Sequence, residues 1–458
     1  NPIIIGHEFA GVIVEVGEKW KDQFKPGMKF AQQPALNYKG SLASPGYSYE
    51  YFGGACTYCI IPHEVMELGC LMPYEGDSFF GASLGEPMSC IIGGYHGNYH
   101  TNKRNHDLSV GTKAGGDIII LGGCGPMGLG AVSYGIQIEN RPKRIVVTDI
   151  DDAKIERARE VIPEAKAAEN GVELLYVNTA KMADPVEELK AITGGKGYDD
   201  VFVYIPNRAV AEMGDRLLAF DGCMNFFAGP TDNQFKAEIN LYNCHYTSTH
   251  ILGTTGGNND DLIEANELAA KGKIEPAVMV THVGGIDSIA ETTLNLPKIP
   301  GGKKLSYTQF NMPMTAIEDF GKLGETDPLF KKLDEICKAN RGLWSAEAEP
   351  APRTRARRRE PSWRTRGCRA AGPHQTWTPA CCRPAGTSPP PGTRTAAAGS
   401  SSTRSVAGST PGAPAPAVVA MGTGAAGAAK GPAPAAPAEG GGSAPLAAAG
   451  AGPGRRRT

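Results

Sequence analysis

The first part of the chain alternates short apolar runs with glycine and proline turns. Val12–Val16 and Cys56–Ile61 are each followed directly by a turn residue. Short runs bounded in this way predict strands. Residues 1–65 are therefore expected to be β-rich, and the mostly apolar, small-residue segment 77–99 is expected to be helical.

From about residue 115 the pattern changes to apolar runs that alternate with charged segments. Asp117–Leu121 is a continuous apolar run, as expected for a parallel strand that is buried on both faces. The alternation continues with predicted strands at Arg144–Asp149, 201–204 and 224–227, and with predicted helices near 152–161 and 260–271. This order predicts an α/β fold with a doubly wound parallel sheet of the Rossmann type.

These patterns divide the chain into four segments. We expect a β-rich domain over 1–110, a Rossmann domain over 111–272, a segment returning to the first domain over 273–345, and a low-complexity tail over 346–458. Because Asn1 opens directly onto an apolar run without a cap or a turn, the first domain is expected to lack its N-terminus.

The tail differs from the rest of the chain in composition. After residue 350 there is no Ile, Phe or Tyr, and the basic residues are 14 Arg and one Lys. Such a segment buries too little apolar surface to offset its ordering entropy, so we expect disorder. The basic run 355–359 has two interpretations, a nucleic-acid or phosphate patch and a segment without a selected role. The low complexity favours the second.

The balance of charged residues also differs between residues 1–350 and residues 351–458, and it limits the classes of partner that each part can bind. Residues 1–350 carry 31 Lys and Arg against 46 Asp and Glu, and residues 351–458 carry 15 against two. The acidic first part disfavours nucleic acid and anionic membranes. No apolar run reaches the roughly 18 residues of a membrane helix. Eight of the eleven cysteines lie in residues 1–350 at irregular spacings, and no secretory signal opens the chain, which predicts reduced thiols and a cytoplasmic protein.

A glycine motif carries the strongest chemical signal. Gly123, Gly125 and Gly128 form G-x-G-x-x-G between a predicted strand and a predicted helix. The first glycine permits a tight turn, the second lets the backbone approach a pyrophosphate, and the third lets helix and strand pack closely. Asp149 ends the next strand, 21 residues after Gly128. A carboxylate there accepts the ribose hydroxyls of NAD and repels the extra phosphate of NADP.

A second motif, Gly6-His7-Glu8-Phe9-Ala10-Gly11-Val12, is weak when taken alone, because an isolated histidine near a strand is more often packed or exposed than a metal ligand. Together the two motifs resemble the zinc-containing medium-chain alcohol and polyol dehydrogenases, in which Gly-His-Glu-x-x-Gly-x-Val precedes Gly-x-Gly-Pro-x-Gly. The order and spacing of the parts match from residue 1 to about 345. The resemblance implies a GroES-like catalytic domain over 1–110, with its N-terminus truncated.

The resemblance also implies roles for particular residues. His7 would be a catalytic zinc ligand, and Glu8 an alternative ligand or an outer carboxylate that helps to move the proton. The segment Leu84–Cys90 resembles the Glu-Pro-Leu-Ser segment of polyol dehydrogenases, which places Glu86 at the zinc. The cofactor would be held by the glycine motif with Pro126 and Met127, by Asp149, and by Thr254.

Some features depart from the family pattern or lie outside it. The family's first zinc ligand, a cysteine, would precede Asn1, and residues 31–52 lack the four cysteines of a structural zinc lobe. Cys56 and Cys59 are expected to face opposite sides of a strand rather than to act as a pair. Substrate phosphate is a possible partner of Lys303, Lys304 and Arg104, but solvated charges are the favoured interpretation.

The resemblance implies hydride transfer between NAD and a polyol or sugar phosphate, with zinc as the Lewis acid. NADP stays open as the cofactor. The alternatives are a zinc dehydrogenase acting on threonine or a secondary alcohol, and an inactive dinucleotide-binding fragment that lacks its first zinc ligand. We expect a small-molecule substrate, no membrane partner, no nucleic acid, and a homodimer or homotetramer.

Overall fold

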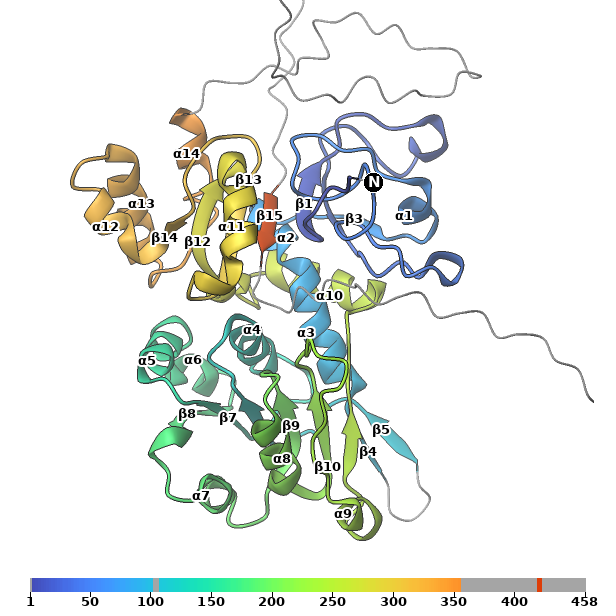
Figure 1. The fold of residues 1–458 in the computed structure, drawn as a ribbon, viewed down its shortest axis with the longest axis vertical. Coiled ribbons are helices and arrows are strands. Elements are labelled where there is room, and N and C mark those ends of the chain that lie inside the picture. Colours follow the sequence, from blue (N-terminus) through green and yellow to red (C-terminus); the bar gives the residue numbers. More distant parts are fainter. Residues whose placement is uncertain (1, 102–106, 356–417, 422–458) are drawn as a thin grey trace, which may run out of the picture.

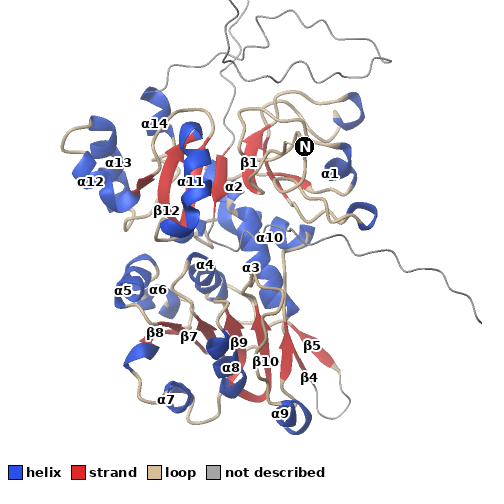
Figure 2. Ribbon diagram, viewed as in Figure 1, coloured by secondary structure: helices blue, strands red, loops and turns tan. Residues whose placement is uncertain are grey.

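The computed structural model describes residues 2–101, 107–355 and 418–421. Two groups of strands, one above the other in Figure 2, are each surrounded by helices. No helix within these residues is long and apolar enough to cross a membrane. Arg104 and most of the predicted tail lie outside the described residues.

The lower strands form a parallel sheet with the order β11-β10-β9-β6-β7-β8. Its strands are β6 (Asp117–Leu121), β7 (Arg144–Asp149), β8 (Glu173–Asn178), β9 (Tyr198–Val203), β10 (Leu218–Phe226) and β11 (His250–Leu252). The strand order reverses between β6 and β9, and ligands of such sheets bind at this reversal, beside the carboxyl ends of the strands. This confirms the predicted Rossmann-type sheet.

Helices cover both faces of this sheet. They are α4 (Pro126–Gly135), α5 (Asp152–Val161), α6 (Glu164–Ala168), α7 (Pro185–Ile192) and α8 (Arg208–Leu217). Two more helices follow, α9 (Leu241–Tyr246) and α10 (Asn259–Ala270), and α10 packs against α3. Ile118 and Ile120 of β6 belong to the core that contains α4 and α5, whereas Ile119 and Leu121 belong to the core under α7 and α8. The side chains of β6 therefore pack into two cores, one on each face of the sheet, which explains its continuous apolar run.

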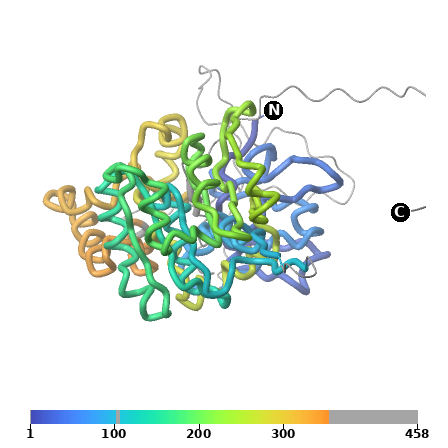
Figure 3. Tube along the Cα trace, turned by 90° about the horizontal axis from the view of Figure 1, so that it is seen from below, coloured from blue at the N-terminus to red at the C-terminus, as the bar shows by residue number. Residues whose placement is uncertain are grey.

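The upper strands form a sheet with the order β14-β12-β13-β15-β1-β2-β3 (Figure 1). Its strands are β1 (Glu8–Val12), β2 (Lys29–Gln32), β3 (Leu71–Pro73), β12 (Val280–Gly285), β13 (Lys303–Tyr307), β14 (Thr315–Ala316) and β15 (Val418–Met421). Strands β12 and β13 place the late segment in the same sheet as the start of the chain. Around the sheets lie α1 (His63–Glu67), α11 (Ile289–Asn295), α12 (Phe320–Leu323) and α13 (Pro328–Ala339). Figure 3 shows the late helices (orange) at the opposite end from the N-terminal residues (blue).

Two helices, α2 (Phe79–Ser83) and α3 (Gly85–Gly97), connect the two sheets and confirm the predicted helical segment. Figure 1 shows α3 running from the upper sheet down beside the lower one. Met88 and Ile91 of α3 share one buried core with Ile120 of β6 and with Leu305 of β13. This shared core fixes α3, and therefore Glu86 on it, relative to both sheets. A small hairpin, β4 (Tyr99–Thr101) and β5 (Leu108–Val110), follows α3.

Two predicted strands of the first segment are wrong in detail. The first strand is Glu8–Val12 rather than Val12–Val16. Cys56–Ile61 is not a strand, because the Cys56 amide donates to Gly54 O at 2.8 Å and bends the chain there. The two cysteines are therefore not held on opposite faces of a sheet.

The predicted tail contains ordered structure that its composition did not indicate. Helix α14 (Pro350–Arg355) begins after residue 345, and Ala348 and Glu349 before it are buried. Strand β15 lies between β13 and β1 and pairs antiparallel with both, with Val419 opposite Phe9 and Ser306. The prediction that residues 346–458 are disordered throughout is wrong at these two places. The neighbouring edges of β1 and β13 supply the hydrogen-bond partners of β15.

The buried carboxylate of Glu349 anchors this late segment. It accepts hydrogen bonds from the Phe79 and Phe80 amides and from the Tyr307 hydroxyl, at 2.8–3.0 Å. The variant Glu349→Ala leaves these buried donors unsatisfied, so we expect it to lower the free energy of unfolding by about 2–4 kcal/mol. Urea denaturation measures this loss, with exposed Glu347→Ala as the control. Equal stability of the two variants would show that Glu349 is no anchor.

His282 on β12 makes stability depend on pH. Burial, helped by the charge of Lys304, lowers the pKa of His282 to about 4, whereas the reference value is 6.5. Between pH 6.5 and pH 4 the imidazole of His282 is protonated in the unfolded chain but neutral in the folded protein. The free energy of unfolding therefore falls as the pH drops from 6.5 towards 4. Between pH 7 and pH 5 we expect a loss of about 1–2 kcal/mol from this residue. Urea denaturation at both pH values should show that His282→Gln loses less stability than the unchanged protein. An equal loss contradicts the assignment.

Candidate active site

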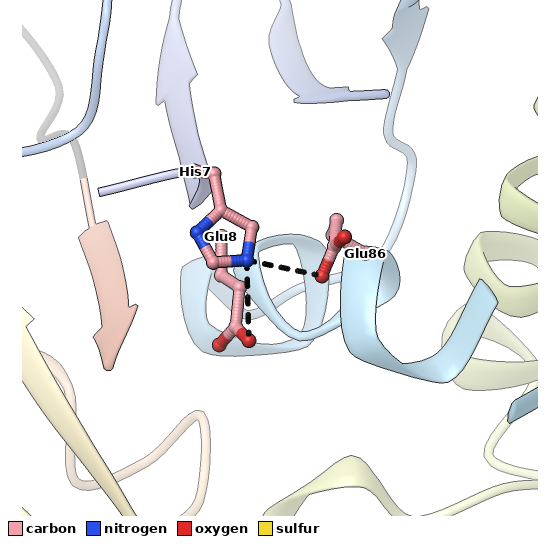
Figure 4. A group of neighbouring side chains, drawn as sticks. All are labelled: His7, Glu8 and Glu86. Atoms are coloured by element: carbon pink, nitrogen blue, oxygen red, sulfur yellow. Dashed lines mark ion pairs between the residues drawn. The ribbon is translucent and has the colours of Figure 1, made fainter. Parts of the chain in front are cut away.

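Three predicted site residues from two distant parts of the chain converge between the sheets (Figure 4). His7 Nε2 lies 3.8 Å from Glu8 Oε1 and 4.0 Å from Glu86 Oε2, and one ligand atom from each residue lies within 4.8 Å of the others. His7 and Glu8 stand at the start of β1, and Glu86 stands in the first turn of α3. One imidazole and two carboxylates in this arrangement can hold a divalent metal ion.

A bend at the start of β1 brings the adjacent side chains of His7 and Glu8 together. Successive residues of a regular strand point to opposite faces. Here Gly6 takes φ +93°, a backbone conformation that favours glycine, and His7 lies in the bend that follows. Gln32 of β2 donates to His7 O at 3.0 Å and ties the bend to the sheet.

Tyr47 covers the imidazole of His7. The two rings stack with their centroids 4.4 Å apart, and the Tyr47 hydroxyl lies 3.0 Å from His7 Nε2 in a hydrogen bond. Gly46 lies so close to the Gly6–His7 peptide that a Cβ on it would be 2.4 Å from Gly6 C. Burial, with the charges of Glu86 and Glu8, raises the pKa of Tyr47, so its hydroxyl keeps its proton.

Glu8 is buried and only half satisfied. Its Oε1 accepts a hydrogen bond from Lys303 Nζ at 2.5 Å, and the Lys303 side chain is itself buried. Its other oxygen, Oε2, has no hydrogen-bond partner among the described residues. A buried carboxylate oxygen without a donor is costly. A cation at the His7–Glu8–Glu86 cluster would satisfy it.

The carboxyl of Glu86 lies in surroundings that disfavour its ionised form unless a cation is close by. Burial raises the pKa of its carboxyl, and the charge of Glu8 adds to that effect. The Cys90 thiol, one turn later on α3, donates to Glu86 Oε1 at 3.5 Å. A divalent ion would stabilise the ionised form of both carboxylates, which favours a metal at this cluster.

Lys303 compensates the charge of Glu8, which leads to a testable expectation. The variant Lys303→Met leaves Glu8 and Glu86 buried without their cation, at a cost of roughly 3–5 kcal/mol of stability. A zinc ion bound at the cluster would restore the missing positive charge, so added zinc should raise the melting temperature more in this variant than in the unchanged protein.

The neighbouring residue offers a matched control. Lys304 is also buried but donates to Pro300 O and Gly302 O rather than to Glu8. Lys304→Met should therefore leave the zinc-dependent rise unchanged. An equal rise in the two variants, measured by differential scanning fluorimetry, contradicts the role of Lys303.

The glycine motif has the geometry of a close turn. A Cβ on Gly123 would meet Val147 Cγ1 at 2.6 Å, and a Cβ on Gly128 would meet Gly123 O at 2.3 Å. Gly125, the N-cap of α4, has only Gly122 O near it, at 3.9 Å. Strand and helix are thus pressed together at Gly123 and Gly128, while Gly125 leaves room for a ligand at the first amides of α4. No described side chain caps this helix.

Asp149 lies beside this turn. It ends β7, which pairs with β6, and the Gly123 amide donates to Thr148 O at 2.8 Å. Its Oδ1 accepts from the Ile150 and Asp151 amides at 2.8 and 3.2 Å. The structure therefore brings the glycine turn and the predicted ribose-binding carboxylate to one edge of the sheet. Pro126 and Met127 form the first turn of α4 at the same edge.

Thr254 lies in the other half of the sheet. It follows β11, and β10, β9 and β6 separate that strand from β7. Its hydroxyl donates to Asn225 Oδ1 at 3.2 Å. The structure therefore does not bring Thr254 to Asp149, and any shared ligand would have to extend along the edge of the sheet.

Sequence reasoning missed two neighbours of the cluster, Lys303 and Tyr47. Lys303 and Lys304 were expected to be solvated, but both are buried, at 2% and 0% exposure. Both lysines lie on strand β13, which is buried along its whole length, and a strand covered on both faces buries adjacent residues alike. Tyr47 has no motif context, so nothing in the sequence indicated its contact with His7.

Comparisons with known proteins agree with this architecture. The family described as zinc-binding dehydrogenase matches residues 126–271, and the alcohol dehydrogenase GroES-like domain matches residues 1–69. A relative named mannitol-1-phosphate 5-dehydrogenase, from Aliivibrio fischeri, is 51% identical over 76% of this chain and 82% of its own. A relative from Klebsiella pneumoniae, named L-sorbose 1-phosphate reductase, is 42% identical over the same shares.

A solved structure supports the fold. A zinc-binding dehydrogenase from Sinorhizobium meliloti, bound to NADP, superposes with a TM-score of 0.52 at 20% identity, covering 66% of this chain and 81% of that one. The family resemblance drawn from the two sequence motifs is confirmed. The chain belongs to the zinc-binding dehydrogenases, oxidoreductases of the zinc-type medium-chain class.

Proposed function

We propose that this protein transfers a hydride between NAD(H) and a hydroxyl or ketone carbon of a polyol or sugar phosphate, with Zn²⁺ held by His7, Glu8 and Glu86. The observation that carries the proposal is the convergence of these three side chains, within 4.8 Å, between the two sheets. The imidazole and carboxylate donors suit zinc, and the unpartnered Glu8 Oε2 is explained by such an ion.

When bound, zinc supplies a Lewis acid that lowers the pKa of a substrate hydroxyl, and nicotinamide supplies the hydride acceptor or donor. The transfer of the proton and the orientation of the metal ligands depend on side chains of the protein. When it is not itself a zinc ligand, Glu8 would accept the hydroxyl proton through Oε2, while Lys303 holds the other oxygen of the same carboxylate. Tyr47 orients the imidazole of His7 by stacking against it. Glu8 is thus the proposed catalytic residue.

The cofactor proposal depends on the edge of the lower sheet. The space at Gly125 and the first amides of α4 can receive a pyrophosphate, with Gly123, Pro126, Met127 and Gly128 shaping the turn. Asp149 would accept the ribose hydroxyls, and its charge opposes the 2′-phosphate of NADP. NAD is therefore the proposed cofactor. NADP stays an outcome of the test, and Thr254 a further proposed contact.

The substrate class rests on the names of the relatives. Two proteins that are 51% and 42% identical to this chain are named for a polyol phosphate and for a ketose phosphate. We propose the reduction of a ketose phosphate by NADH and a proton to a polyol phosphate and NAD, with L-sorbose 1-phosphate and glucitol 6-phosphate as the pair to test first.

A substrate panel tests the proposal. The purified, zinc-loaded chain should be assayed with NADH and NADPH on L-sorbose 1-phosphate, fructose 6-phosphate and unphosphorylated sorbose, and with NAD and NADP on threonine and 2,3-butanediol. We expect kcat/KM to be highest for a ketose phosphate with NADH. Preference for threonine or the diol would overturn the substrate class. NADH binding without turnover of any compound would instead support the inactive dinucleotide-binding alternative.

Two further sequence expectations stay proposals. We propose a cytoplasmic location, because the eight cysteines of the described residues are all free thiols. We also propose a homodimer or homotetramer, which sedimentation equilibrium can measure.

A further inference from the structure

The hydroxyl of Tyr47 lies on the nitrogen of His7 that faces the metal cluster. It is 3.0 Å from Nε2 in a hydrogen bond, while the two rings stack with their centroids 4.4 Å apart. A tyrosine hydroxyl is protonated at neutral pH, so it donates this bond and Nε2 accepts it. Nε2 is also the nitrogen nearest to Glu8 and Glu86 (Figure 4). The hydroxyl and a metal ion would therefore compete for the same lone pair of His7.

The Tyr47 oxygen lies at the distance from Nε2 that a neighbouring metal ligand would have. Oxygen atoms of Glu8 and Glu86 lie 3.8 and 4.0 Å from Nε2, and the Tyr47 oxygen lies 3.0 Å from it. Two ligands of a tetrahedral zinc ion, with bonds of about 2.0–2.2 Å, lie roughly 3.4 Å apart. In a catalytic zinc site the position that the protein leaves open receives the substrate oxygen. The Tyr47 hydroxyl is therefore within reach of a substrate oxygen on the ion.

The backbone at Tyr47 is held in place, whereas the side chain has room to move. The Gly46 amide donates to Phe52 O at 3.1 Å, and a Cβ on Gly46 would meet Gly6 C at 2.4 Å. Tyr47 is nevertheless 53% exposed. Within the described residues its hydroxyl has no hydrogen bond other than that to His7. A small rotation of the side chain can therefore move the hydroxyl while the loop stays where it is.

We propose that Tyr47 contacts the substrate, and that its hydroxyl moves from His7 Nε2 to the substrate oxygen when the metal binds. Without the metal, the hydroxyl keeps Nε2 unprotonated, which is the state of the nitrogen that a metal requires. When the lone pair of Nε2 binds the ion, the freed hydroxyl donates to the oxygen of the alcohol or ketone being converted. This inference rests on the proposed function and adds a substrate-binding residue to it.

The variant Tyr47→Phe separates this role from mere support of His7, because it keeps the stacked ring and removes only the hydroxyl. If the ring alone mattered, the variant would bind zinc and substrate as the unchanged chain does. If the hydroxyl only held the imidazole in position, the variant would bind zinc more weakly. The proposed exchange instead predicts tighter zinc binding together with poorer use of the substrate.

The first test measures zinc binding and needs no turnover. Zinc dissociation constants of the unchanged full chain and of Tyr47→Phe are determined by competition with a chromophoric chelator. Because no hydroxyl has to leave Nε2, we expect the constant of Tyr47→Phe to fall about two- to tenfold, the range that corresponds to one hydrogen bond. The control Tyr58→Phe alters an exposed tyrosine without a hydrogen bond to the cluster within the described residues, and it should leave the constant unchanged. An equal or higher constant in Tyr47→Phe overturns the proposal.

The second test measures the substrate contact. The chain is assayed with NADH and L-sorbose 1-phosphate in an excess of zinc. We expect Tyr47→Phe to lower kcat/KM at least about tenfold, because a hydrogen bond to an oxygen that gains charge is lost, and Tyr58→Phe to leave it unchanged. An unaltered kcat/KM in Tyr47→Phe refutes the contact. If the unchanged chain converts no compound of the substrate panel, the proposed function fails, and the zinc titration alone decides on Tyr47.

Discussion

The variant His7→Ala is expected to lose its zinc and its dehydrogenase activity together. His7 Nε2 faces both carboxylates of the cluster, so its removal leaves only Glu8 and Glu86 for the ion. Loss of an outer partner of a metal ligand costs roughly 10–100-fold in affinity, and loss of the ligand itself should cost more than about 100-fold. Zinc content per chain, measured by plasma mass spectrometry, and turnover with NADH report the two effects.

A matched control is available for this variant. His63 is exposed and pairs only locally, with Glu67 one turn away on α1. His63→Ala should therefore keep both zinc and turnover. If His7→Ala retains as much zinc as His63→Ala, His7 is not a ligand, and the proposed metal set is wrong.

Asp149→Asn should change the choice of cofactor. The carboxylate ends β7 beside the glycine turn, where a charge would bind ribose hydroxyls and oppose a 2′-phosphate. Neutralising it weakens charge-assisted hydrogen bonds to NADH and removes the repulsion of NADPH. We expect the ratio of the dissociation constants for NADH and NADPH to shift by at least about tenfold towards NADPH. Isothermal titration calorimetry measures both constants.

The neighbouring Asp152→Asn separates a local effect from a general change in charge. Asp152 is exposed and held by Asn178 and Lys181, and no strand end places it at the turn. Its removal should leave the ratio unchanged. An equal shift in the two variants, or no shift in Asp149→Asn, contradicts the assignment of the ribose site.

The Rossmann half of the fold could be predicted from local pattern. Strand β6 is a continuous apolar run because both of its faces are buried, and the strand, glycine turn, helix and acid follow each other within 33 residues, from Asp117 to Asp149. Each of these signals lies within a short stretch of sequence, so it can be recognised without knowledge of distant contacts. The predicted helix near 152–161 and strand 144–149 match α5 and β7 at both ends.

The metal cluster could be predicted only in part. His7 and Glu8 were identified as candidate metal ligands through the family resemblance. Their convergence with Glu86 depends on the bend at Gly6 and on the placement of α3. Lys303 stands 295 residues after Glu8, and the contact follows from the pairing of distant strands. Such long-range neighbours leave no local periodicity in the sequence.

The early and late segments were predicted least well. Cys56–Ile61 has the composition of a strand, yet one tight turn at Cys56 breaks it. Strand β15 lies in a segment with few apolar residues, and its partners are the edges of β1 and β13. A strand whose hydrogen bonds all come from distant elements cannot be inferred from its own four residues.

The central claim is that a metal ion held by His7, Glu8 and Glu86 faces a dinucleotide lying along the glycine turn. Crystals of the chain grown with zinc and NADH, with diffraction recorded on both sides of the zinc absorption edge, test it most directly. The account predicts one anomalous peak bonded to His7 Nε2 and to the two carboxylates, with the ribose of NADH on Asp149. A zinc peak bonded to other side chains, or a dinucleotide bound away from Gly125, would contradict it.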